Sequence, residues 1–279
     1  MKSLLRFNPP IFPHKFKPPF LTGVSCFLLL LYSCSVIKIP GKGKGRNLVE
    51  ENAYTPLQAQ DYADHFASLK KSFLNTPGVN RVRLDRYTTS YFQNVLSEII
   101  SKNEIFFLSL RSAEVTVIDS EMPLHFSLPK GEIFLSRGLI TKYIKHESML
   151  VSILAFELVR SEKLLYPKDV IIPTGSLPLE RIIMLSRLSL EEKMQVHKWA
   201  HHLTERSGYD GEYYLSWLQT QNRNTADFLL QVGDANLITR EEALFKAHLI
   251  KTDTENNVIK KNSSKNFYTL LNKLRDNIL

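Results

Sequence analysis

Three side chains with metal-binding chemistry recur at helical spacing in the second half of the chain. His197, His201 and Glu205 stand at positions i, i+4 and i+8, so a helix would place them on one face. Two histidines at i and i+4 can share a metal ion. A solvent-facing polar stripe has the same spacing, and so do histidines packed against a loop. A zinc site at these residues is therefore one alternative for this chain.

The other common catalytic motifs are missing from the sequence. The chain has no G-x-S-x-G run, no P-loop and no dinucleotide-binding fingerprint. His202 lies next to His201, and the other histidines after residue 50 show no ligand spacing; they are His65, His125, His146 and His248. Serine-nucleophile and nucleotide chemistry therefore have no support in the sequence.

The hydrophobic pattern predicts helices around a small sheet. Composition is that of an ordinary globular protein, with 279 residues, 43% hydrophobic and 23% charged. Apolar residues recur at helical spacing in residues 55–75, 88–101, 147–162, 190–205, 211–220, 240–250 and 267–278. Runs rich in β-formers cover 105–110, 115–118, 124–128 and 132–136. Residues 166–189 contain three prolines and predict a long loop with one short helix. We therefore expect an α+β fold, with a small, mainly antiparallel sheet packed on a helical body.

Three runs in this framework carry a family resemblance. Residues 126–139 read F-S-L-P-K-G-E-I-F-L-S-R-G-L, residues 147–157 read E-S-M-L-V-S-I-L-A-F-E, and residues 207–210 read S-G-Y-D. In this order and spacing they resemble the HtpX- and BepA-like zinc metalloendopeptidases, over roughly residues 87–218. The resemblance implies a zincin-type body. It also implies that the strand Glu132, Ile133, Phe134, Leu135, Ser136 is an edge beside the substrate cleft.

The departures from the family pattern fall on the zinc ligands. Phe156 and Arg160 occupy the positions of the two histidines of H-E-x-x-H, and Gln195 occupies that of the third ligand, a glutamate. His197 stands where the family has an aspartate that orients a ligand. Only Glu157, the family's general base, is retained. The resemblance therefore implies a vestigial base and no catalytic residue; a glutamate without any catalytic ancestry, on the surface or in the core, is the alternative.

Side-chain chemistry explains why these departures matter. A phenylalanine has no lone pair to offer, and arginine is a permanent cation that repels zinc. Without the metal, bound water is not activated and the peptide carbonyl is not polarised. We expect Arg160 to take the place of the metal, paired with Glu157 three residues earlier and within reach of Gln195. Phe156 is expected to fill the former metal cavity, and no cofactor is expected unless zinc binds at the His197 set.

The N-terminus has the order of a bacterial lipoprotein signal. Residues 1–33 combine lysines and arginines with a short apolar run, which is too short to span a bilayer. Leu31-Tyr32-Ser33-Cys34 resembles a lipobox, in which Cys34 is lipidated; an ordinary cleaved signal with a chance cysteine is the alternative. Residues 34–50 are Gly-rich and basic and predict a flexible tether. Residues 51–250 then form the peptidase-like domain, and 251–279 a linker with a C-terminal helix.

These features together predict a lipid-anchored pseudo-metallopeptidase of the bacterial cell envelope. Ser35 after the lipidated cysteine favours the periplasmic face of the outer membrane, by resemblance to bacterial sorting rules. The expected partners are the membrane, through Cys34, and an unfolded or extended polypeptide, through the 132–136 edge. The net charge of +8 does not predict nucleic-acid binding, because no aromatic-interleaved basic motif accompanies it. The alternatives are an active zinc metalloendopeptidase using His197, His201 and Glu205, and a purely structural lipoprotein.

Overall fold

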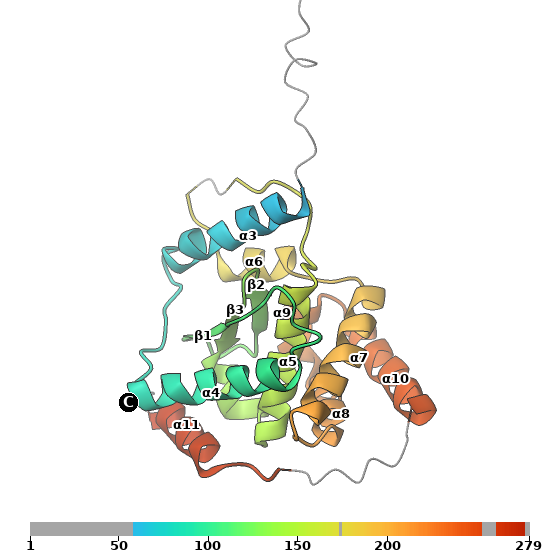
Figure 1. The fold of residues 1–279 in the computed structure, drawn as a ribbon. Coiled ribbons are helices and arrows are strands. Elements are labelled where there is room, and N and C mark those ends of the chain that lie inside the picture. Colours follow the sequence, from blue (N-terminus) through green and yellow to red (C-terminus); the bar gives the residue numbers. More distant parts are fainter. Residues whose placement is uncertain (1–57, 173–174, 253–260, 277–279) are drawn as a thin grey trace, which may run out of the picture. The chain divides into compact units, whose positions relative to one another are not determined.

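The fold combines many helices with one small sheet, as the sequence predicts (Figure 1). The computed structural model describes residues 58–172, 175–252 and 261–276. The predicted signal segment 1–33, Cys34 and the tether 34–50 lie outside the described residues. The described elements, in chain order, are α3 (Ala59–Leu74), α4 (Arg86–Lys102), β1 (Glu114–Ile118), β2 (His125–Leu128), β3 (Glu132–Ser136), the π-helix η1 (Leu139–Tyr143), α5 (Glu147–Glu162), α6 (Leu179–Leu185), α7 (Leu190–Arg206), α8 (Glu212–Arg223), α9 (Thr225–Val232), α10 (Ala235–Thr252) and α11 (Lys265–Asp276).

The sheet has the order β1-β3-β2, so β3 lies in the middle. β3 pairs with β1 in parallel and with β2 in antiparallel orientation. The sheet is therefore mixed rather than mainly antiparallel. The expectation that Glu132, Ile133, Phe134, Leu135 and Ser136 form a free edge is wrong, because both sides of this strand already carry ladder hydrogen bonds. The outer strands of the three-stranded sheet are β1 and β2 instead.

The predicted strand at residues 105–110 is a turn that a carboxylate holds in place. The backbone amides of Leu108, Ser109 and Leu110 donate to the two carboxylate oxygens of Glu162 at 2.9, 3.1 and 2.8 Å. Successive amides that point at one anion make such a loop a compact anion nest. Ile105 is 85% exposed, whereas Phe107 and Leu110 enter the core. The β-forming residues of this segment therefore take part in no β-ladder.

Helix boundaries follow local capping signals. α4 starts after Asp85, whose carboxylate accepts from the amide of Thr88 at 2.8 Å. α3 starts at Ala59, because Gln58 is extended and its amide donates to Asp61 at 3.0 Å. This is later than the predicted start at residue 55, which lies outside the described residues. α9 and η1 were not expected from the sequence pattern.

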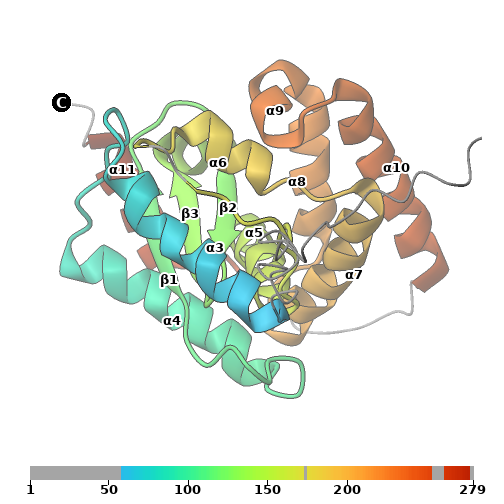
Figure 2. The same ribbon diagram turned by 90° about the horizontal axis from the view of Figure 1, so that it is seen from above.

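The sheet separates two layers of side chains. One face carries Phe126 and Phe134, which stack at 4.6 Å and pack against Phe73 of α3. The other face carries Ile133 and Leu135, which join the main core with α4 and α5. Figure 2 shows α3 and α6 over the first face. Because the side chains of β3 alternate between the two faces of the sheet, α5 packs against the face opposite α3 and α6.

α5 is the central helix of the main core. Residues 147–161 are all buried, not only the predicted apolar face. A helix buried all round must find a partner for each polar side chain it carries. The charged residues of α5 are therefore candidate functional residues.

Among residues 58–172, 175–252 and 261–276, no helix combines the length and apolarity needed to cross a bilayer.

Candidate functional site

Glu157 is completely buried on α5 and faces β2. Its Oε1 lies 2.6 Å from Nδ1 of His125, and its Oε2 accepts from the hydroxyl of Ser127 at 2.7 Å. A carboxylate can only accept hydrogen bonds, so Nδ1 of His125 carries the proton. Strand alternation explains why both partners reach the helix, because residues 125 and 127 point to the same face of β2. The site therefore joins two segments about thirty residues apart.

Arg160 completes this buried cluster. Its Nη1 lies 3.8 Å from Oε2 of Glu157, its Nε donates to the carbonyl of Leu165 at 3.3 Å, and its guanidinium carbon lies 4.9 Å above the ring of Tyr166. The side chain is 3% exposed. The ion pair that the sequence predicts between Glu157 and Arg160 is therefore present. Its separation of 3.8 Å is long, so the shorter hydrogen bonds with His125 and Ser127 are the main contacts of the Glu157 carboxylate.

The pKa of Glu157 reflects two opposed effects. Burial raises it, while the hydrogen bond and electrostatic effect of His125, the charge of Arg160 and the hydrogen bond from Ser127 lower it, and the net pKa lies below the usual value. The carboxylate is therefore ionised at neutral pH, with its lone pairs directed at donors. Such a group has little capacity to accept a further proton from water as a general base.

A second buried cluster surrounds His197 on α7. Its Nδ1 lies 2.9 Å from the hydroxyl of Tyr214, and its Nε2 lies 3.2 Å from Oε1 of Glu241 on α10. Lys193, one turn earlier on α7, lies 3.1 Å from the same carboxylate oxygen. Burial lowers the pKa of His197, and the bond and charge of Glu241 only partly offset this. Both ring nitrogens of His197 are thus engaged with protein groups.

Phe156 stands between the two clusters. Its ring centroid lies 5.8 Å from that of His125 and 5.0 Å from that of His197. A cavity of about 30 Å³ borders Phe156, Glu157, Arg160 and both histidines. This volume is about that of one water molecule. No amino-acid side chain of a substrate fits there, and the predicted role of Phe156 as filler of this region is consistent with its contacts.

The remaining predicted ligand positions do not converge on this place. Gln195 is exposed on α7, so the predicted bond between Arg160 and Gln195 is absent. The helix turns His197 inward instead, two residues later. His201 lies 3.7 Å from Glu205 and packs against the rings of Tyr214 and Phe245. Within the described part of the chain, no three His, Cys, Asp or Glu side chains are arranged to hold a metal ion. A zinc site at His197, His201 and Glu205 stays a prediction.

The edge of β2 beside α5 is occupied at His125. The amide of His125 donates to Oε1 of Gln231 at 3.0 Å, and Nε2 of Gln231 donates to the carbonyl of His125 at 2.7 Å. The side-chain amide on α9 thereby satisfies this edge in the way a peptide group of an added strand would. At His125, the edge of β2 is therefore closed by the protein itself.

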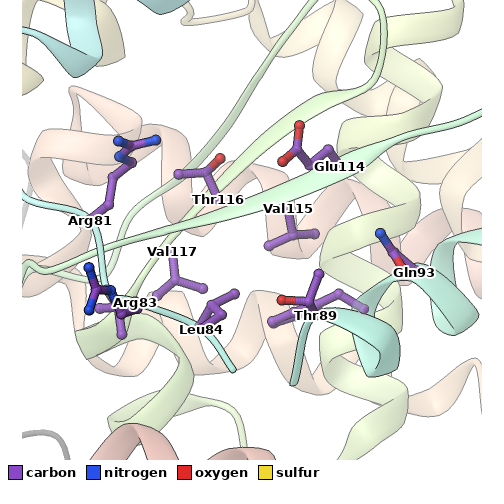
Figure 3. A pocket seen from close by; sticks show the side chains of 11 residues that line it. Arg81, Arg83, Leu84, Thr89, Gln93, Glu114, Val115, Thr116 and Val117 are labelled. Atoms are coloured by element: carbon purple, nitrogen blue, oxygen red, sulfur yellow. The ribbon is translucent and has the colours of Figure 1, made fainter. Parts of the chain in front are cut away.

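The edge of β1 is open along part of its length. A hollow of about 430 Å³ lies between β1, the segment 81–84 and the first turns of α4. Figure 3 shows Arg81 and Arg83 at the Val117 end of this hollow, and Glu114 and Gln93 toward the other end. This second place is large enough for part of an extended peptide, and the buried cluster on α5 is not.

Several residues of the buried site were not expected from the sequence. His125, Ser127, Tyr166, Lys193, Tyr214, Gln231 and Glu241 line it or bond within it. The one signal available for His125 and Ser127 was their alternation in the predicted 124–128 strand. Glu241 and Gln231 carry no local signal, because α9 and α10 reach the site through the tertiary fold.

Comparison with known proteins adds no identification. No protein-family model matches the chain, and no curated protein matches it significantly. The class that the structure defines is an α+β domain whose central helix carries a closed, buried ion-pair cluster. The resemblance to zinc metalloendopeptidases stays a prediction.

Proposed function

We propose that this protein is a lipid-anchored pseudo-metallopeptidase that holds no zinc and binds polypeptides, as an adaptor in envelope quality control. One observation carries the proposal: Glu157 is held in a closed cluster by His125, Ser127 and Arg160. A hydrolytic zinc site needs three donors and an open position for water. In this chain a cation of the protein itself, Arg160, stands beside the carboxylate.

The cluster also argues against a serine-nucleophile mechanism. A nucleophilic serine needs a base that takes its proton, usually a histidine oriented by a carboxylate. Ser127 and His125 both bond to the same carboxylate, so His125 Nδ1 is not available to Ser127. Ser127 is fully buried as well. The geometry supports a stabilising role for both residues.

The anchor and location are part of the same proposal. Cys34 of the lipobox-like run would be lipidated and would hold the domain at the membrane, with the periplasmic face of the outer membrane favoured by Ser35. Several acyl chains give stable attachment where a single one gives marginal binding. A domain fixed at the envelope by its N-terminus would meet unfolded clients there.

A second candidate is a purely structural lipoprotein that only reuses the fold. The observation that favours it is the closed cleft beside α5, where Gln231 occupies the edge of β2 and a cavity of about 30 Å³ remains. The two candidates differ in whether any other surface binds polypeptide.

One set of measurements on the full chain, purified in detergent, tests the proposal. We expect substoichiometric zinc by elemental analysis, no cleavage of an unfolded protein with or without added zinc, and suppression of that protein's aggregation. Palmitate incorporation should depend on Cys34, with Cys34→Ala as control. One tightly held zinc per chain, or cleavage that Glu157→Gln abolishes, would establish an enzyme. Failure to bind any unfolded protein would favour the structural candidate.

A further inference from the structure

We propose that the outer edge of β1 is the polypeptide-binding site, and that it selects extended segments carrying acidic side chains. This inference rests on the proposed polypeptide-binding function and replaces the 132–136 edge, which β1 and β2 cover. The ligand is an added strand that pairs with β1 in the hollow between β1, residues 81–84 and α4 (Figure 3). Its acidic side chains meet Arg81 and Arg83.

The backbone of β1 offers unpaired groups at this edge. The amide of Glu114 donates to Gly131, on the β3 side. Because the peptide groups of a strand alternate between its two edges, those of Val115 and Val117 point away from β3. The carbonyl of Val117 accepts from the amide of Val82 at 2.9 Å, which confirms this direction. The groups of Val115 lie where the segment 81–84 has left the strand, and an extended peptide can pair with them.

The hollow has an apolar floor suited to the side chains of such a strand. Val115, Val117 and Phe92 are buried beneath it, and Val82 and Leu84 are partly buried along its wall. Side chains of an added strand alternate toward this floor and toward solvent. A volume of about 430 Å³ accommodates a few residues of extended chain.

Charge selects the kind of peptide. Lys70 pairs with both Glu114 and Glu132, at 3.4 and 2.5 Å, and offsets one of their two negative charges. Arg81 and Arg83 are exposed, and neither lies within ion-pair distance of a carboxylate among residues 58–172, 175–252 and 261–276. Arg81 also lines an adjoining hollow of about 380 Å³ that adds Lys71. The positive charge therefore continues past the Val117 end, where acidic side chains of a ligand gain bidentate contacts with guanidinium groups.

Labelled peptides of about eight residues, the length of an ordinary strand, test the proposal by fluorescence anisotropy on the full chain in detergent. One peptide carries glutamates, one has glutamines in their place and one has lysines. We expect the glutamate peptide to bind the most tightly. Arg81→Glu with Arg83→Glu should weaken its binding by about tenfold or more and improve that of the lysine peptide. Arg181→Glu, an exposed arginine of α6 outside the hollow, is the matched control and should change neither.

N-methylation of the peptide tests strand pairing without altering the protein. Two versions carry methyl groups on alternate amides, in the two possible phases, and only the phase that faces β1 should lose binding. If peptides bind the wild type but the double arginine variant and both methylated versions bind equally well, the β1 site is overturned while polypeptide binding stands. If no peptide of any composition binds, both the site and the proposed function fail.

Discussion

Nδ1 of His125 lies 2.6 Å from Oε1 of Glu157, which joins an edge strand to the centre of a fully buried helix. Neither group has access to solvent to compensate for the loss of its partner. Together with Arg160 and Ser127, this pair forms the buried cluster in the region where the sequence predicts a peptidase-like site. Each carboxylate oxygen of Glu157 accepts a hydrogen bond, whereas the buried Nη2 of Arg160 has no hydrogen-bond partner within the described residues.

Removing the carboxylate should destabilise the protein strongly. Glu157→Leu leaves the buried cation of Arg160 unpaired, and we expect the free energy of unfolding to fall by about 3 to 5 kcal/mol. Adding Arg160→Met should recover part of this loss, because the uncompensated charge is then gone. Urea unfolding measures both, with the exposed Glu104→Gln as a control that changes stability by less than about 0.5 kcal/mol. Equal stability of the single variant and wild type would contradict a paired cluster.

Stability should decline as the solution becomes mildly acidic. Burial, then the charges of His248 and His202, lower the pKa of His201 to about 4. The pKa of His197 is also lowered. The unfolded chain takes up these protons below about pH 6.5 while the folded chain does not, so the free energy of unfolding falls between about pH 6.5 and 4.

Urea unfolding across this pH range measures the effect. His201→Asn should reduce the slope of stability against pH, because one of the two groups no longer titrates. Stability that rises as the pH falls through this window would have the wrong sign for histidines with lowered pKa values. A slope unchanged in the variant would remove His201 as a cause.

The amide of Gln231 should protect the edge of β2. Gln231→Ala removes both hydrogen bonds to the backbone of His125, and we expect a loss of about 1 to 3 kcal/mol and faster exchange of the His125 amide hydrogen. Gln231→Glu retains the acceptor but loses the donor, so its stability and its amide exchange rate should lie between those of the wild type and Gln231→Ala. Hydrogen exchange by mass spectrometry over residues 124–128 reads this out. Unchanged protection in Gln231→Ala would show that the edge is satisfied by other means.

Glu162 should determine the order of the turn at residues 105–110. Its carboxylate accepts from three successive amides, so Glu162→Ala should raise amide exchange at Leu108, Ser109 and Leu110 and cost about 1 to 3 kcal/mol. Exposed Lys163→Ala is a neighbouring control whose effect should be confined to its contact with Phe106. If the amides of Leu108, Ser109 and Leu110 stay protected in Glu162→Ala, the carboxylate of Glu162 does not hold this turn in place.

Local pattern predicted much of the helical framework. α4, α7, α8 and α11 lie close to their predicted ranges, because apolar spacing and caps such as Asp85 report on their own helix. The same information failed at residues 105–110, where β-forming residue types occupy a turn. It failed again at β3, because a period of two residues shows that a strand is half-buried and does not show which strands flank it.

The sequence by itself determined the chemistry that positions 156 and 160 exclude: a phenylalanine and an arginine supply no ligand to zinc in any fold. It also determined that Glu157 and Arg160 lie on one helix within reach of each other. Only the tertiary structure decided that His125 and Ser127 bond to Glu157 and that Glu241 engages His197. It also decided that β1, and not β3, is an outer strand with an edge that is open along part of its length. These outcomes depend on packing between segments distant in the chain, which local spacing does not encode.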